Sequence, residues 1–224
     1  MLNAARAIAA KDLRISLSRG GGLAQALLLG LLLIFVFSLA QDMGETMPPQ
    51  GAAAAFWLSS AFCQVLVFNM LYSQEEINGT RLGLLLMPAP TQAVWLGKAA
   101  AGLVLILLAQ AVFLPAAIVF LGQHVGPLWP SALLALLLAD VGMAALGSLL
   151  GALSQGQAAR ESLLSIVLFP LLIPLLLAGI RVGAGAFAEG LPEGVDAWLG
   201  IAAAFDAMFC GAGLLLFGHL YTGD

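Results

Sequence analysis

Charged side chains are scarce in this 224-residue sequence: Asp, Glu, Lys and Arg make up 9% of it, and 62% of it is hydrophobic. A water-soluble domain carries about 25% charged residues, so the chain has too few charges to cover a globule in water. The mean hydropathy is +1.04. Bilayer hydrocarbon suits such a composition, because helices satisfy their own backbone hydrogen bonds there. The sequence therefore predicts an all-α integral membrane protein.

Other scarcities exclude further classes of protein. The two cysteines, Cys63 and Cys210, both lie in apolar runs and form no CxxC pair. A disulfide framework is thus excluded, and we predict no metal site. Eight Lys and Arg residues with a net charge of −4 argue against nucleic acid as a partner. Ala99 follows Gly97-Lys98 where a phosphate-binding loop needs Ser or Thr, so we expect no nucleotide site and no bound cofactor.

Six apolar runs are long enough to cross a membrane, which takes about 20 helical residues. The first run begins only after a long basic stretch, so we expect a retained N-terminus and not a cleaved signal peptide. Only short linkers separate the runs, so we expect one transmembrane domain over 1–224. The predicted spans are 23–40, 52–72, 94–121, 130–153, 162–182 and 198–218.

The basic residues predict the orientation of these spans. Seven of the eight fall on one side of the predicted membrane, and only Arg181 falls on the other. Cytoplasmic loops carry the excess of Lys and Arg, so we expect both termini in the cytoplasm and the chain in a bacterial inner membrane. The seven are Arg6, Lys11, Arg14, Arg19, Arg81, Lys98 and Arg160, and the opposite loops hold Asp42, Glu45, Glu189, Glu193 and Asp196.

Segment 1–20 mixes aliphatic and basic residues and is too polar to span. We expect it to form an amphipathic helix in the headgroup region, with basic side chains toward the phosphates and aliphatic ones dipped inward. The alternative is a simple retention signal made of positive charges.

The loop at 73–93 carries the most information. It opens with the acidic pair Glu75 and Glu76, turns at Asn78-Gly79, and continues into an apolar run at 82–87 that ends at Pro88. Six apolar residues cannot cross a bilayer, so we expect a short helix along the cytoplasmic surface. Such a helix, next to exposed carboxylates, suits the docking of a cytoplasmic partner. An ordinary amphipathic connector would give the same pattern.

Two further features lie inside the predicted spans. Pro170 and Pro174 each remove a backbone hydrogen bond from the fifth span. We expect this span to be kinked or locally unwound and to act as a hinge. The alternative is that the prolines only shape static packing. Asp140 and Asp206 are buried ionisable groups, which must face the protein interior or a partner. They are expected to be protonated interhelical contacts or partner contacts. An intramembrane aspartyl protease is a third reading, but no Gly-x-Gly-Asp motif surrounds either residue.

The loop residues resemble the "E…GT…LLL.P……GK" pattern of ABC-2-type transporter permeases. The segment from Arg160 through LFPLLIPLLLAGI, which ends at Ile180, is similar to heme exporter protein B (the CcmB family) of the cytochrome c maturation system. Gly83 departs from the pattern, since related permeases often carry an acidic residue there. The resemblance implies an ABC-2-type permease fold and an ATPase-docking role for Glu75, Glu76, Gly79, Thr80, Leu84, Leu85, Leu86 and Pro88.

The resemblance also implies a role. Such a permease has no ATPase activity of its own and works with a CcmA-like ATPase, which binds the ATP, a CcmC-like heme-handling membrane protein and a small CcmD-like subunit. The assembly uses ATP hydrolysis to release a heme-loaded CcmE-like chaperone, with heme as the possible cargo. The alternatives are an ABC-2-type permease for a drug, lipid or glycan, and an intramembrane enzyme built on Asp140 and Asp206.

Overall fold

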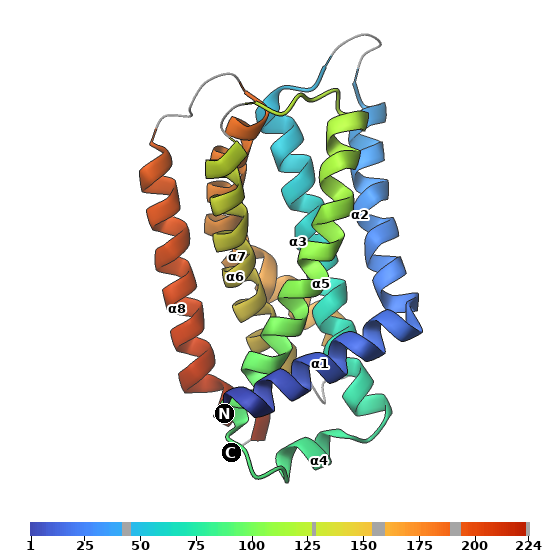
Figure 1. Cartoon of the computed structure of the whole chain (residues 1–224), viewed down its shortest axis with the longest axis vertical. Helices are drawn as coiled ribbons and strands as arrows, with labels where there is room; N and C mark the ends of the chain where they lie inside the picture. Colours follow the sequence, from blue (N-terminus) through green and yellow to red (C-terminus); the bar gives the residue numbers. More distant parts are fainter. Residues whose placement is uncertain (42–45, 127–128, 154–159, 189–193, 223–224) are drawn as a thin grey trace.

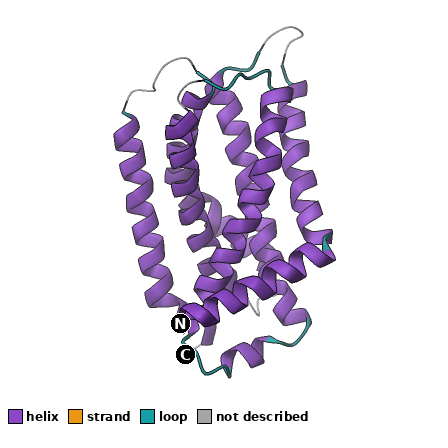
Figure 2. Ribbon diagram, viewed as in Figure 1, coloured by secondary structure: helices purple, strands orange, loops and turns teal. Residues whose placement is uncertain are grey.

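The computed structural model describes residues 1–41, 46–126, 129–153, 160–188 and 194–222, and these form helices joined by short loops, without a strand (Figure 2). The expected acidic residues Asp42, Glu45, Glu189 and Glu193 lie outside the described residues. The elements are α1 (Leu2–Arg19), α2 (Gly21–Leu39), α3 (Pro49–Ile77), α4 (Arg81–Leu85), α5 (Thr91–Phe120), α6 (Trp129–Leu153), α7 (Arg160–Gly183), η1 (Ala184–Ala186) and α8 (Val195–Thr222).

Helices α2, α3, α5, α6, α7 and α8 are long and apolar enough to cross a membrane, which confirms the predicted six spans. They form an upright bundle, and both chain termini lie at the same end of it as α1 and α4 (Figure 1). We call this the terminal end. Helix α3 has 29 residues and is about 44 Å long at 1.5 Å per residue. It exceeds a hydrocarbon core of ~30 Å, so it is long enough to extend beyond the hydrocarbon.

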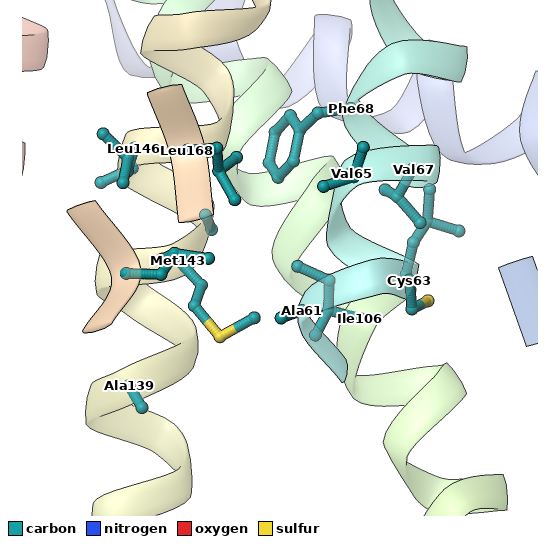
Figure 3. Close-up of a cluster of buried hydrophobic side chains, with 14 of the residues drawn as sticks. Ala61, Cys63, Val65, Val67, Phe68, Ile106, Ala139, Met143, Leu146 and Leu168 are labelled. Atoms are coloured by element: carbon teal, nitrogen blue, oxygen red, sulfur yellow. The ribbon is translucent and has the colours of Figure 1, made fainter. Parts of the chain in front are cut away.

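Helix α3 is the centre of the bundle. It contacts α2, α5, α6 and α7, and its side chains meet those of α5, α6 and α7 in the cluster of Figure 3. Phe68 on α3 has no exposed surface. A Cβ on either Gly102 of α5 or Gly147 of α6 would overlap its ring. Helices in lipid gain little from the hydrophobic effect and associate through such close packing at small residues.

The predicted N-terminal helix is confirmed as α1, which lies outside the bundle of spans and crosses its terminal end (Figure 1). Its expected position in the headgroup region stays a prediction. Ala5, Ile8, Asp12 and Ser16 are buried, and their spacing of three or four residues places them on one face of the helix. That face packs on α5. Leu2 is 73% exposed, and the basic residues Arg6 and Arg14 are exposed as well.

Helix α7 runs through both prolines. Pro170 and Pro174 lie inside the continuous helix Arg160–Gly183, so of the two expected outcomes, a kink or local unwinding, the structure excludes unwinding. Neighbouring turns keep the helix together although each proline lacks a backbone donor. Pro170 is exposed and Pro174 is half-buried. Whether these residues act as a hinge stays a prediction.

We predict that Gly97→Val separates α1 from the bundle. A Cβ at Gly97 would lie 2.7 Å from the Ala5 carbonyl oxygen and 2.9 Å from the Ile8 Cβ, and overpacking of this kind typically costs about 1–3 kcal/mol. The measurements are the unfolding temperature in detergent and the rate of proteolysis within α1. Gly83→Val is the control, because no atom lies within 4 Å of a Cβ there. Equal behaviour of the two variants would contradict the prediction.

Candidate functional site

Polar side chains follow one face of α3 toward the terminal end. Ser60, Gln64, Tyr72 and Glu75 are buried, and their spacings of four, eight and three residues keep them close to one line along the helix. They meet polar groups of α5 and α6, because lipid offers no hydrogen-bond partner outside the bundle. This line ends in a cluster of charged residues.

The cluster joins three helices through Lys98 of α5, Glu75 of α3, and Asp12 and Lys11 of α1. The Lys98 Nζ lies 2.8 Å from Glu75 Oε1 and 3.3 Å from Asp12 Oδ2. The Lys11 Nζ lies 3.0 Å from Asp12 Oδ1 and 3.1 Å from the same Glu75 oxygen. Two cations and two carboxylates therefore form a closed and neutral set, which we call the ion cluster.

Burial makes the ion cluster more than a surface salt bridge. The Lys98 side chain has no exposed surface, and the side chains of Asp12 and Glu75 are each 3% exposed. The Lys98 Nζ also donates to the Leu71 carbonyl oxygen at 2.9 Å and lies 4.6 Å from the centre of the Tyr72 ring. Buried charges persist only when partners replace the lost water, as these do.

Lys11 is the solvent-facing member of the ion cluster, with 39% of its side chain exposed. Partial burial lowers the pKa of its ammonium group, but the carboxylates of Asp12 and Glu75 raise it by more, so the pKa lies above its ordinary value. Lys11 is therefore positively charged at neutral pH, and it lies between the buried members of the cluster and the solvent.

A hydrogen-bonded chain continues from the ion cluster to α6. The Tyr72 hydroxyl lies 2.7 Å from the Ser148 carbonyl oxygen and 2.9 Å from the Ser148 Oγ. The Ser148 hydroxyl donates to the Trp95 carbonyl oxygen at 3.0 Å, and the Trp95 indole donates to the Ala145 carbonyl oxygen at 3.2 Å. The end of α3 is thus fixed to α5 and α6 by polar contacts.

The loop after α3 is held in a defined shape. Gly79 has φ of 64°, the Thr80 amide donates to the Glu75 carbonyl oxygen at 2.9 Å, and the Gly79 amide donates to that of Glu76 at 3.1 Å. These two bonds are the Schellman motif, which needs a left-handed residue after the helix. The predicted turn at Asn78-Gly79 is confirmed, and it directs the chain into α4.

Helix α4 is the predicted short surface helix. Leu82 is 69% exposed and Leu86 is 83% exposed, whereas Leu84 and Leu85 are half-buried and pack against the core. Pro88 is exposed after the helix. The Arg81 guanidinium donates to the Tyr221 carbonyl oxygen at 3.0 Å and lies 5.6 Å from the ring of the same tyrosine, which ties α4 to the end of α8.

The expectation of two exposed carboxylates is wrong for Glu75. Its residue is 2% exposed because the side chain points to Lys98, whereas Glu76 is exposed as expected. Both residues lie on α3, which continues five residues beyond the predicted end of the span at 72. Behind α4 lies a cavity of about 320 Å³, lined by Lys11, Asp12, Ile15, Gln74, Glu75, Asn78, Thr80, Gly83 and Leu84.

The two aspartates in the spans are buried, as predicted. Asp140 has no exposed surface and accepts a hydrogen bond of 2.8 Å from the Gln110 Nε2. Asp206 is 8% exposed and its Oδ1 lies against Gly142, since a Cβ there would overlap that oxygen. Asp140 therefore meets α5, and Asp206 meets α6.

The prediction from sequence missed most of the ion cluster. From sequence, Lys98 is only one of the basic residues that set the orientation of the spans, and Asp12 lies in the predicted interfacial segment 1–20. A signal existed, because Lys98 is the eighth residue of a 30-residue apolar helix. A charge at such a position needs a partner within the protein. Its carboxylate partners lie 23 and 86 positions away in the sequence, so the pairing itself could not be read from the sequence.

A comparison with models of protein families identifies the family of this chain. The model of the family described as "CcmB protein" matches residues 3–215. No curated protein matches the chain. Within the described residues, no group of three or more His, Cys, Asp or Glu side chains is placed to hold a metal ion.

We predict that Lys98→Met destabilises the protein by about 3–5 kcal/mol, because it leaves two buried carboxylates with only Lys11 as partner. The double variant Glu75→Gln with Lys98→Met should recover part of this loss, since it removes one charge of each sign. Unfolding temperature in detergent and abundance in the membrane measure both effects. Lys11→Met is the matched control and should cost less, because Lys11 is partly exposed. A Lys98→Met protein as stable as wild type would contradict the prediction.

Proposed function

The chain belongs to the CcmB family, the membrane permease component of the heme exporter, and on this premise we propose that a separate ATPase drives it by docking on α4. We further propose that it lies in the bacterial inner membrane, with the terminal end in the cytoplasm. The excess of Lys and Arg at that end supports this orientation. ATP would then be bound and hydrolysed by the partner subunit.

The observation that carries the docking proposal is the exposure of α4. Leu82 and Leu86 present large apolar side chains at the terminal end, beyond the last turns of the longest spans. Exposed apolar groups on a helix fit a hydrophobic groove of a partner protein. Five of the expected docking residues are exposed, namely Glu76, Gly79, Thr80, Leu86 and Pro88. Glu75, Leu84 and Leu85 instead support α4 from behind.

A docked partner could act on the spans through contacts already described. The Schellman turn connects α4 to α3, and Arg81 connects it to α8. The ion cluster then joins the end of α3 to α1 and α5. A displacement of α4 by a cytoplasmic ATPase would therefore reach four other helices without passing through a flexible linker.

The remaining partners follow from the family membership and form part of the proposal. They are a CcmA-like ATPase, a CcmC-like heme-handling membrane protein, a small CcmD-like subunit and a CcmE-like heme chaperone. Heme is the proposed cargo of the assembly. This chain would supply the movement and would leave iron coordination to its partners.

We predict that Leu86→Asp abolishes copurification of the ATPase and leaves the abundance of the permease unchanged. Leu86 is 83% exposed, so the new charge costs the isolated chain little but is buried without a partner in the complex. Val125→Asp is the control, because Val125 is 60% exposed but lies at the other end of the bundle. Normal copurification with Leu86→Asp would place the docking surface elsewhere.

We predict that replacing Pro170 and Pro174 together with Leu uncouples ATP hydrolysis from heme-chaperone release. Each substitution restores a backbone donor in α7 and stiffens the helix. The double variant should assemble with the ATPase and accumulate heme-loaded chaperone. Copurification and chaperone-bound heme, measured in the same strain, test this. Normal release, or loss of assembly, would mean that the prolines serve static packing only.

A further inference from the structure

A second polar site lies inside the bundle, away from the ion cluster. Asp140 is about midway along α6, and it meets Gln110 of α5 and, through it, Ser60 of α3. None of these three side chains is more than 3% exposed. The Gln110 Nε2 lies 2.8 Å from Asp140 Oδ1 and 3.3 Å from the Ser60 Oγ. The Ser60 hydroxyl donates to the Phe56 carbonyl oxygen of its own helix at 3.0 Å.

The donors and acceptors at this site do not balance if Asp140 is ionised. Asp140 Oδ2 and Gln110 Oε1 are both buried without a hydrogen-bond partner. A carboxylate oxygen and an amide oxygen can each only accept, so neither can serve the other. The Gln110 amide NH2 already donates to both Asp140 and Ser60. The Ser60 hydroxyl donates its proton to the Phe56 carbonyl oxygen. The site lacks one donor.

The charges do not balance either. None of the four salt bridges of the ion cluster includes Asp140. An isolated carboxylate in so apolar a place would lose several kcal/mol of hydration, and a buried group in that position neutralises instead. One proton on the carboxyl group would remove the charge and supply the missing donor together.

We propose that Asp140 is a proton-binding site and is held as the neutral acid in a closed pair with Gln110. The amide donates to Asp140 Oδ1, and the acid O–H on Oδ2 donates to the amide oxygen Oε1. The pair clamps α5 to α6, and the bond to Ser60 adds α3. Asp140 therefore lies in the membrane interior without a charge, although it is an acidic residue.

Infrared spectroscopy of the purified protein in detergent at neutral pH tests the charge state. The difference spectrum between wild type and Asp140→Asn should contain the carbonyl band of one protonated carboxylic acid. Asp206→Asn is the matched control, because it removes the other buried aspartate of the six spans and should leave the Asp140 band in place. Carboxylate bands in the wild-type minus Asp140→Asn spectrum, without the acid band, would overturn the proposal.

Three variants test the pair itself through the unfolding temperature. Asp140→Asn should match wild type, because an amide can make both hydrogen bonds to Gln110 and carries no charge. The exchange Gln110→Glu with Asp140→Asn should also match, since it moves the acid to α5 and keeps an acid–amide pair. Asp140→Leu should lower the unfolding temperature by on the order of 5 °C, because it leaves Gln110 without its partner.

The same experiment separates a proton from a metal cation. Wild-type protein in sodium, potassium and choline chloride should unfold at the same temperature if the site holds a proton. Stabilisation by one metal cation that Asp140→Asn abolishes would identify a cation site and overturn the proposal. Failure of Asp140→Asn to fold would also overturn it, because that variant keeps every hydrogen bond that the proposal assigns.

Discussion

A lysine without exposed surface dictates the arrangement of the terminal end. Lys98 lies inside an apolar helix, and its ammonium group needs negative partners wherever water cannot reach. Glu75 and Asp12 provide them from two other helices. The register of α3 against α5, and the position of α1 across both, are therefore set together. Moving any one of the three helices by a turn would separate a buried charge from its partner.

The ion cluster also explains why the acidic pair splits into two roles. Glu75 and Glu76 are neighbours on a helix, so their side chains point about 100° apart. Glu75 faces the bundle and neutralises Lys98, whereas Glu76 faces outward beside the turn to α4. One residue thus stabilises the platform from which α4 projects, and the other belongs to the surface that a partner would meet. A sequence motif that contains both carboxylates therefore places one of them in the interior and the other on the surface.

Composition and periodicity were sufficient for the spans, the N-terminal helix and the short surface helix. Each depends on local length and hydropathy, which a single sequence contains. The packing of α1 on α5 and the burial of Glu75 could not be predicted, because both involve Lys98, whose partners are distant in sequence. The same limit applied to Gln110, whose role becomes visible only when α5 lies beside Asp140 of α6. Polar residues inside spans indicate that they have partners within the protein, but they do not identify those partners.

The packing around Phe68 has a consequence for movement. Its ring fits against the backbones of Gly102 and Gly147 with no room for a single added methyl group, so α3, α5 and α6 cannot slide past one another at this level without separating. These three helices form a rigid block. The spans α2, α7 and α8 are more exposed, and close contacts at Gly30, Gly179 and Gly213 hold them to this block. Any movement that keeps the contacts of Phe68 must therefore turn or tilt α3, α5 and α6 together as one piece.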